Sequence, residues 1–314
     1  MEAEEYFSKD FEWEDLKSEI ENDPSFQYHL LPFDPSSSSA IRPPEEESNA
    51  WRKFHSRHYT GKFFKERRYL LKEFPELVSC GKGSRVLEVG CGNGSTALPI
   101  LRGNENVTLY ACDCSSEALE YAREMVDASN VASFQHRFHP FVFDFSLSSF
   151  PDWLFCSPCR KTSLGQSFPS DIKEAGRTLT GVPSKETSCC LGGLDFVTLI
   201  FTLSAIPLHM MPSALMKCFS VLKPGGFLLF RDYGLFDMTM LRFELDKRVG
   251  FCEYMRSDGT RSYFFSLETV RDLFVRAGFI EVELDYCCIK SLNRKKGKSM
   301  RRVWVHGKFQ KPPL

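Results

Sequence analysis

The sequence has almost no net charge, no long apolar run and no basic leader. Its 314 residues carry 40 lysines and arginines against 41 aspartates and glutamates, a formal net charge of −1. Such a balance excludes a whole-molecule attraction to nucleic acid, so any basic surface must be local. No stretch approaches the roughly 18 apolar residues of a membrane span, and the acidic N-terminus resembles neither a signal nor a transit peptide. We expect no membrane contact and a cytoplasmic location, with the nucleus as the alternative.

The most informative pattern lies at residues 85–101. An apolar run at 86–89 suits a strand buried on both faces. Glycines follow at alternate positions, Gly90, Gly92 and Gly94, and then a segment that reads as the start of a helix. Glycines permit a tight turn and let a ligand approach the backbone, and the helix N-terminus offers free N–H groups. We therefore predict the front of a dinucleotide-type βαβ unit.

The glycine spacing departs from the phosphate-binding form, because the pattern is Glu-x-Gly-x-Gly-x-Gly. A second apolar strand at 107–113 ends in Asp113, about twenty residues past the glycines, where a carboxylate can accept from both ribose hydroxyls. Together with Glu88, Gly90 and Gly92, this acid resembles the cofactor half of a class I S-adenosylmethionine methyltransferase. The alternative is a tight turn in some other α/β protein.

The remaining pattern predicts an α/β fold with a seven-stranded, mostly parallel Rossmann-like sheet. Further strands are expected at 133–145, 194–201 and 227–230, with a closing pair at 280–289 and 303–309. Helices are expected at 116–127, 210–222 and 266–277, and an Asp-Gly turn predicts a hairpin at 254–265. Ligands bind beyond the carboxyl ends of such strands, and the residues expected there are Gly90, Asp113, Asp144, Ile200 and Asp232.

Three segments lie outside this core pattern. Residues 1–48, acidic and then rich in serine and proline, predict a mostly disordered extension with a short amphipathic helix as an option. Residues 49–80 are basic and aromatic, and Trp51, Phe54, His55 and His58 share one helical face. These aromatics either dock a helix on the main domain, residues 81–314, or stack on bases or on a cofactor while the cations hold phosphates.

The third segment, residues 146–193, predicts a long inserted loop whose composition cannot bury a core. It holds four of the twelve cysteines, Cys156, Cys159, Cys189 and Cys190. The adjacent second pair is awkward for one zinc ion, so we expect unremarkable loop cysteines and no metal.

Several motifs together resemble the eukaryotic enzymes that make N3-methylcytidine in tRNA, from about residue 49 to the C-terminus without the insertion. The most specific runs are Arg231-Asp232-Tyr233-Gly234 and Asp258-Gly259-Thr260-Arg261-Ser262-Tyr263-Phe264-Phe265. The resemblance implies S-adenosylmethionine as cofactor, cytidine 32 of the tRNA anticodon loop as target, and for some members a protein partner, such as an aminoacyl-tRNA synthetase. It implies an N-terminal helical lid and these cofactor contacts: Trp51, His55 (tyrosine in family members), Gly90, Gly92, Asp113, Asp144, Phe145 and Ile200.

Cytosine N3 carries a lone pair and no proton, so methyl transfer to it needs positioning and charge stabilisation, not a general base. Asp232 is the candidate catalytic residue, accepting from the exocyclic amine; alternatively it pairs with Arg231 and shapes the loop. Substrate contacts are expected from Arg231 and Arg261, the latter being either a phosphate grip or a surface ion pair. The sixth strand should run parallel to the first five, which would bring the basic loop 293–302, with Arg294, Lys295 and Lys296, beside the site. Two other hypotheses stay open: a small-molecule or protein methyltransferase, and a non-catalytic subunit with the same fold.

Overall fold

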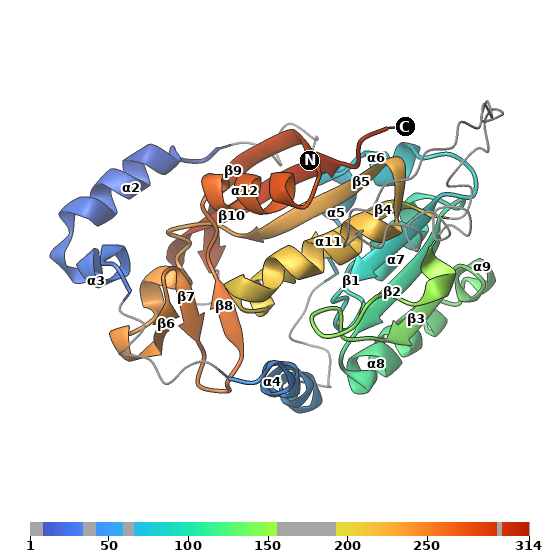
Figure 1. The fold of residues 1–314 in the computed structure, drawn as a ribbon, viewed down its shortest axis with the longest axis horizontal. Helices are drawn as coiled ribbons and strands as arrows, with labels where there is room; N and C mark the ends of the chain where they lie inside the picture. Colours follow the sequence, from blue (N-terminus) through green and yellow to red (C-terminus); the bar gives the residue numbers. More distant parts are fainter. Residues whose placement is uncertain (1–8, 34–41, 59–65, 156–192, 294–296, 314) are drawn as a thin grey trace, which may run out of the picture.

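A seven-stranded sheet forms the centre of the computed structural model, which describes residues 9–33, 42–58, 66–155, 193–293 and 297–313 (Figure 1). The strand order is β3-β2-β1-β4-β5-β10-β9. All neighbours are parallel except β10, which is antiparallel to both β5 and β9. The predicted α/β, mostly parallel sheet is confirmed. The strands are β1 (Arg85–Val89), β2 (Thr108–Asp113), β3 (Phe138–Val142), β4 (Leu194–Ile200), β5 (Leu222–Tyr233), β9 (Ile280–Asn293) and β10 (Lys298–Gln310).

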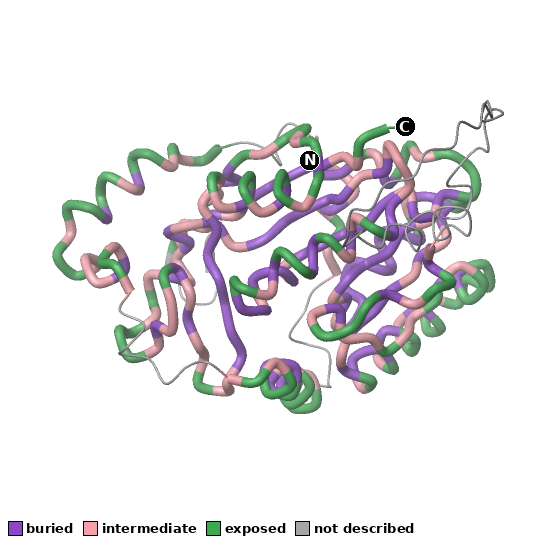
Figure 2. Tube along the Cα trace, viewed as in Figure 1, coloured by how far each residue is buried: buried purple, intermediate pink, exposed green. Residues whose placement is uncertain are grey.

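Helices cover both faces of the sheet and leave two separate apolar cores. One core joins β strands to α11 and α12, and includes Leu87 and Phe230. The other joins them to α5, α6, α7 and α8, and includes Val86 and Leu109. Figure 2 shows the buried strands between helices whose outer faces are exposed. The helices are α4 (Pro44–Arg57), α5 (Leu70–Glu73), α6 (Glu76–Ser79), α7 (Ala97–Gly103), α8 (Ser116–Asp127), α9 (Ala132–Gln135), α11 (Met211–Val221) and α12 (Leu267–Arg276).

A second sheet packs beside the first, with the order β6-β7-β8. Its strands are β6 (Arg248–Gly250), β7 (Glu253–Met255) and β8 (Arg261–Tyr263), so the predicted hairpin around Asp258 and Gly259 is confirmed. The Gly259 turn has φ +85°. Among the described residues, no helix combines the length and apolar composition of a membrane span.

Some predicted boundaries are wrong. The third strand covers only Phe138–Val142, so Asp144 lies two residues beyond its end. The strand expected at 227–230 begins earlier, at Leu222, so the Lys-Pro-Gly-Gly run at 223–226 lies inside β5. The backbone turns there within the strand, since Gly225 has φ +77°.

The N-terminal region is more ordered than its composition predicts. Within the described residues 9–33, α2 (Trp13–Asn22), a 3-10 turn and α3 (Gln27–Leu30) form, and α4 begins at Pro44, inside the predicted linker. Leu16 and Ile20 are buried in the core, and Trp13 stacks between Phe236 and Tyr286. Three apolar side chains at helical spacing are enough to dock an otherwise acidic helix.

The predicted insertion also begins later than expected. Phe150 and Leu154, in the segment around η3 (Asp152–Leu154), are buried in the main core. The ring of Trp153 lies 5.4 Å from that of Tyr110. The prediction that residues from 146 onward contribute nothing to the core is therefore wrong for 146–155. Cys156, Cys159, Cys189 and Cys190 lie outside the described residues.

Candidate active site

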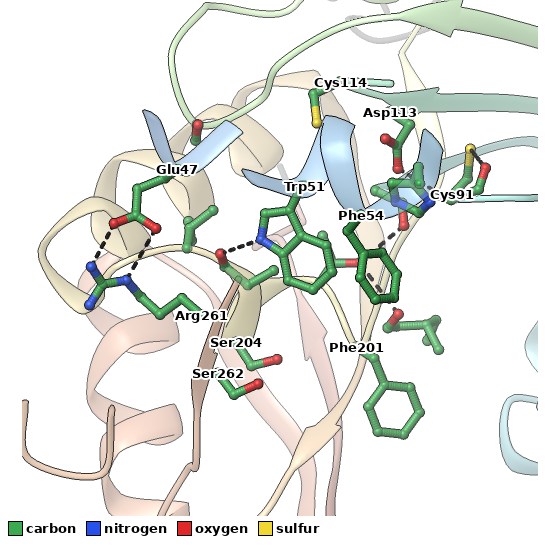
Figure 3. A pocket seen from close by; sticks show the side chains of 18 of the residues that line it. Glu47, Trp51, Phe54, Cys91, Asp113, Cys114, Phe201, Ser204, Arg261 and Ser262 are labelled. Atoms are coloured by element: carbon green, nitrogen blue, oxygen red, sulfur yellow. Dashed lines mark hydrogen bonds and ion pairs between the residues drawn. The ribbon is translucent and has the colours of Figure 1, made fainter. Parts of the chain in front are cut away.

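One cavity lies at the carboxyl ends of the parallel strands, next to helix α4. Its volume is about 590 Å³, within the range of roughly 300–1,000 Å³ seen for small-molecule sites. Its lining comes from α4, the glycine turn, the ends of β2, β4 and β5, the β7–β8 hairpin and β10. Figure 3 shows Trp51 and Phe54 of α4 between the Glu47–Arg261 pair on one side and Asp113 on the other. This is where open α/β sheets bind their ligands.

The glycine turn leaves room that any side chain would fill. Gly90 and Gly92 have φ +66° and +53°, the left-handed region that favours glycine. A Cβ on Gly90 would collide with the side chain of Thr202, and one on Gly92 would lie 3.3 Å from Cε1 of His55. The turn therefore presents bare backbone to the cavity.

Two carboxylates, one at the end of β2 and one just beyond β3, line the same cavity. Asp113 is 6% exposed, and it accepts hydrogen bonds from the backbone N–H groups of Gly92 (2.8 Å) and Ser115 (2.9 Å). Asp144 Oδ1 accepts from the N–H and the hydroxyl of Ser146. Its Oδ2 is buried and has no hydrogen-bond partner in the described part of the chain. A buried acceptor without a donor, beside a cavity, suits a ligand that brings a donor.

Apolar residues complete this half of the cavity. Ile200 ends β4, and Phe145 follows Asp144; both are buried and line the cavity. The ammonium of Lys217, on α11, donates to the carbonyls of Phe145 (3.0 Å) and Ser146 (3.2 Å), which fixes the path of this loop. Burial lowers the pKa of Lys217.

Helix α4 covers the cavity and is tied down by polar contacts. Trp51 donates its indole N–H to the carbonyl of Ala205 (3.0 Å), and Arg52 donates to the carbonyl of Cys114 (3.1 Å). Glu47 pairs with Arg261 of β8 at 2.6 Å, and both side chains are about 5% exposed. The alternative of a surface ion pair for Arg261 is wrong in its location, because the guanidinium is buried between Glu47 and Glu253 (3.1 Å). Arg261 also lines the cavity, and its contact with a phosphate stays a prediction. The aromatic face of α4 docks the helix and lines the cavity at the same time.

The eight residues predicted to contact the cofactor all line this single cavity. They come from α4 and from the ends of four parallel strands, β1 to β4: Trp51, His55, Gly90, Gly92, Asp113, Asp144, Phe145 and Ile200.

Asp232 is placed differently from its predicted catalytic role. It is fully buried and contributes nothing to the cavity lining. Its carboxylate accepts from the backbone N–H groups of Ser204 (3.0 Å) and Tyr233 (2.8 Å). Burial raises its pKa to about 6, although these hydrogen bonds oppose the shift. Asp232 therefore holds two cavity-lining residues in place, which agrees with the loop-shaping alternative but not with a pairing to Arg231.

Arg231 is also buried and cannot contact a substrate as predicted. Neighbouring residues of a strand point to opposite faces, and Arg231 points away from Asp232 toward α5. Its Nη1 lies 2.5 Å from Oε2 of Glu73, and both side chains are fully buried. The guanidinium lies 4.9 Å from the ring of Tyr69 and 4.5 Å from that of Trp304. It supports two aromatic residues of the cavity from behind.

The direction of β9 agrees with the prediction for the basic loop. Because β10 is antiparallel to both neighbours, β9 runs parallel to β5 and its end at Asn293 lies on the cavity side of the sheet. Arg294, Lys295 and Lys296 lie outside the described residues. Of the nearby cations, Arg301 pairs with Glu19 of α2 (2.6 Å).

Four aromatic residues that were not predicted as site residues line the other half of the cavity. They are Tyr69, Phe201, Tyr233 and Trp304. The ring of Phe201 lies 5.1 Å from that of Tyr233 and 6.4 Å from that of Trp304. Phe201 has φ +56°, a conformation that is costly for a bulky residue and typical of functional sites. Tyr233 lies in the specific Arg-Asp-Tyr-Gly run, which was the available signal.

Glu88 lies behind the glycine turn rather than in the cavity. It is 3% exposed and accepts from the hydroxyl of Thr96. Burial raises its pKa to about 7. The residue thus ties β1 to the start of α7.

Comparison with known proteins agrees with this geometry. The family described as "Methyltransferase domain" matches residues 63–284. The tRNA N(3)-cytidine methyltransferase METTL6 of Rattus norvegicus is 35% identical over 86% of this chain and 81% of its own. The tRNA N(3)-methylcytidine methyltransferase Mettl2 of Drosophila melanogaster is 34% identical over 83% of this chain and 70% of its own. A solved methyltransferase structure from Anabaena variabilis has the same fold, with 13% identity, a TM-score of 0.54 and coverage of 87% and 98%.

S-adenosylmethionine fits the residues present. The bare glycine turn admits a close ligand, Asp113 suits ribose hydroxyls, and Asp144 offers an acceptor to an adenine amine. The sequence matches, the sheet order and this donor set lead to one conclusion: the chain belongs to the family of S-adenosylmethionine-dependent tRNA N(3)-cytidine methyltransferases.

Proposed function

We propose that this chain methylates N3 of a cytidine in tRNA, and that the target is cytidine 32 of the anticodon loop. The main support for this proposal is that the cavity consists of two chemically different halves. A half built from Gly90, Asp113 and Asp144 adjoins a half walled by Phe201, Tyr233 and Trp304. Aromatic side chains bind single-stranded bases by stacking, worth about 1–3 kcal/mol for each base. The relatives named above support the choice of base and atom.

Methyl transfer to cytosine N3 depends on positioning of the base more than on proton transfer. When bound, S-adenosylmethionine supplies an electrophilic methyl group on a sulfonium sulfur. Cytosine N3 attacks with its own lone pair, so this chain needs no general base, and a buried Asp232 is no obstacle. The aromatic walls orient the base, and α4 excludes water from the cavity.

Methyl transfer leaves a positive charge on the base. The faces of Tyr233, Phe201 and Trp304 attract such a cation, an interaction worth about 2 kcal/mol when desolvated. Asp232 acts indirectly, because its carboxylate fixes the backbone of Tyr233. N3 lies on the Watson–Crick edge, so the target must be unpaired or turned out of a stack, as a base in an anticodon loop can be.

The proposal includes a protein partner, such as an aminoacyl-tRNA synthetase, and a cytoplasmic location. The basic loop at 294–296 belongs to the same hypothesis as an RNA contact. Adding purified synthetases to the assay below tests the partner, and cell fractionation tests the location.

The deciding experiment supplies labelled S-adenosylmethionine to the purified chain with bulk tRNA, protein and small-metabolite fractions in parallel. Label is expected in tRNA alone, in larger amount when the partner synthetase is added, and digestion should release it as N3-methylcytidine. Label in protein or metabolites would favour the other substrate classes. No label anywhere, with intact cofactor binding, would favour a non-catalytic subunit.

A further inference from the structure

Two arginines lie where the aromatic half of the cavity meets solvent. Arg302 belongs to β10 and Arg256 to the turn between β7 and β8, and both line the cavity while remaining partly exposed. Tyr233 lies near both guanidinium groups. Burial raises the pKa of its hydroxyl, and the charges of Arg256 and Arg302 oppose that rise.

Arg302 is held in place before any ligand arrives. Its Nε donates to Oδ2 of Asp237 at 2.8 Å. Asp237 is fully buried and also accepts from the N–H groups of Val303 (2.9 Å) and Thr239 (2.8 Å). On its other side, the guanidinium lies 5.2 Å from the ring of Trp304. A guanidinium group that is held along one edge by a carboxylate and lies over an aromatic ring loses little conformational freedom when it binds an anion.

The neighbouring acceptors of Arg256 balance its positive charge only in part. Its Nη1 donates to the carbonyl of Arg261 at 3.4 Å. The nearest acid in its turn, Asp258, also lines the cavity, but its Oδ1 accepts from the N–H (3.0 Å) and hydroxyl (2.7 Å) of Thr260. These bonds lower the pKa of Asp258 against the effect of burial, and Arg256 and Arg57 add to the lowering. One carboxylate thus faces two cations.

We propose that Arg256 and Arg302 form a clamp for the phosphates that flank the target nucleotide. The inference rests on the proposed function, because it assumes a base of an RNA chain in the aromatic half. When the base enters the cavity, its 5′ and 3′ phosphates stay in solvent at the opening, and Arg256 and Arg302 are cations of the lining that remain partly exposed to solvent. Arginine forks bind phosphate through paired charge-assisted hydrogen bonds. The clamp selects a nucleotide within a polynucleotide over a free nucleoside.

The test uses displacement of labelled bulk tRNA from the whole chain by two competitors, cytidine and cytidine 3′,5′-bisphosphate. The wild type should bind the bisphosphate at least about tenfold more tightly, the factor expected for one charge-assisted hydrogen bond. Arg256→Gln and Arg302→Gln should each reduce this preference, and the double variant should abolish it. Each variant should also flatten the salt dependence of tRNA binding, by about 0.7 in the log–log slope for each phosphate that is no longer neutralised.

Arg271→Gln is the matched control, because it removes the same charge from an exposed side chain of α12 that pairs with Glu281. It should leave the preference unchanged. Arg302→Gln removes a partner of buried Asp237 and can lower the unfolding midpoint. In that case the result for Arg256→Gln alone tests the clamp. A wild type without the preference, or Gln variants that keep it, would overturn the clamp. If the preference holds but no N3-methylcytidine forms, the proposed function fails and the clamp stands.

Discussion

Glu47→Gln should weaken cofactor binding by releasing helix α4 from the β7–β8 hairpin. The Glu47–Arg261 pair is the only ion pair that the described part of α4 makes with β8, and its atoms are 2.6 Å apart. Three residues of the same helix, Trp51, Phe54 and His55, line the cavity. A loosened helix would therefore open the cofactor half.

The size of the effect follows from what remains after the substitution. Glutamine keeps the bulk but removes the charge, while Arg261 keeps Glu253 at 3.1 Å. Arg261 therefore still has an ion-pair partner. A buried cation without any partner would cost about 3–5 kcal/mol. Arg261 donates two hydrogen bonds to Glu47. Glutamine keeps one of the two oxygen acceptors, so the loss is one charge-assisted hydrogen bond, about 2 kcal/mol. If that free energy holds α4 closed, the Kd for S-adenosylmethionine rises roughly 30-fold.

Titration calorimetry with S-adenosylmethionine measures this, with thermal unfolding run beside it. Glu46→Gln is the control, since Glu46 is the exposed neighbour on the same helix; it should bind as the wild type does. An unchanged Kd for Glu47→Gln would refute the claim that this pair holds the lid.

Three other substitutions test the site and the core. Asp113→Ala should abolish S-adenosylmethionine binding with the fold intact, since two ribose hydrogen bonds of roughly 1.5–3 kcal/mol each are lost; near-wild-type affinity by calorimetry would contradict this. Burial raises the pKa of Glu88 to about 7, so the stability it contributes is present below its ordinary pKa and lost as pH rises through 7. Relative to Glu88→Gln, the wild type should lose about 3 kcal/mol between pH 4.5 and 7.5 in urea unfolding, and parallel pH profiles would disprove it. Leu154→Ala should cost about 2–5 kcal/mol, because the side chain is fully buried; an unchanged unfolding midpoint would show that this segment does not belong to the core.

The sheet and the cofactor half could be read from the sequence because their signals are local. Buried parallel strands are continuous apolar runs, and the turn at Gly90 and Gly92 needs glycine for its backbone alone. Asp113 is the last residue of β2, and Asp144 lies two residues beyond β3. Because the strands are parallel, the residues at their carboxyl ends all lie at one edge of the sheet, and no knowledge of distant contacts is needed to place them there.

The substrate half could not be predicted in the same way, because it depends on which elements pack against each face of β5. Arg231 and Asp232 were predicted to contact the substrate, yet Arg231 pairs with Glu73 of α5 and Asp232 accepts from a backbone N–H of η4 (Leu203–Ala205). The aromatic walls come from segments far apart, so no spacing reveals them. The docking of α2 likewise depends on a distant partner surface, where Trp13 donates to the carbonyl of Leu235, 222 residues further along the chain.

Mass spectrometry of nucleosides from tRNA of cells that lack this chain is the decisive test of the proposed activity. N3-methylcytidine should disappear from position 32 of a subset of tRNAs. Re-expression of the wild type should restore it, whereas Asp113→Ala should not. Unchanged N3-methylcytidine in every tRNA of the deficient cells would overturn the proposed activity.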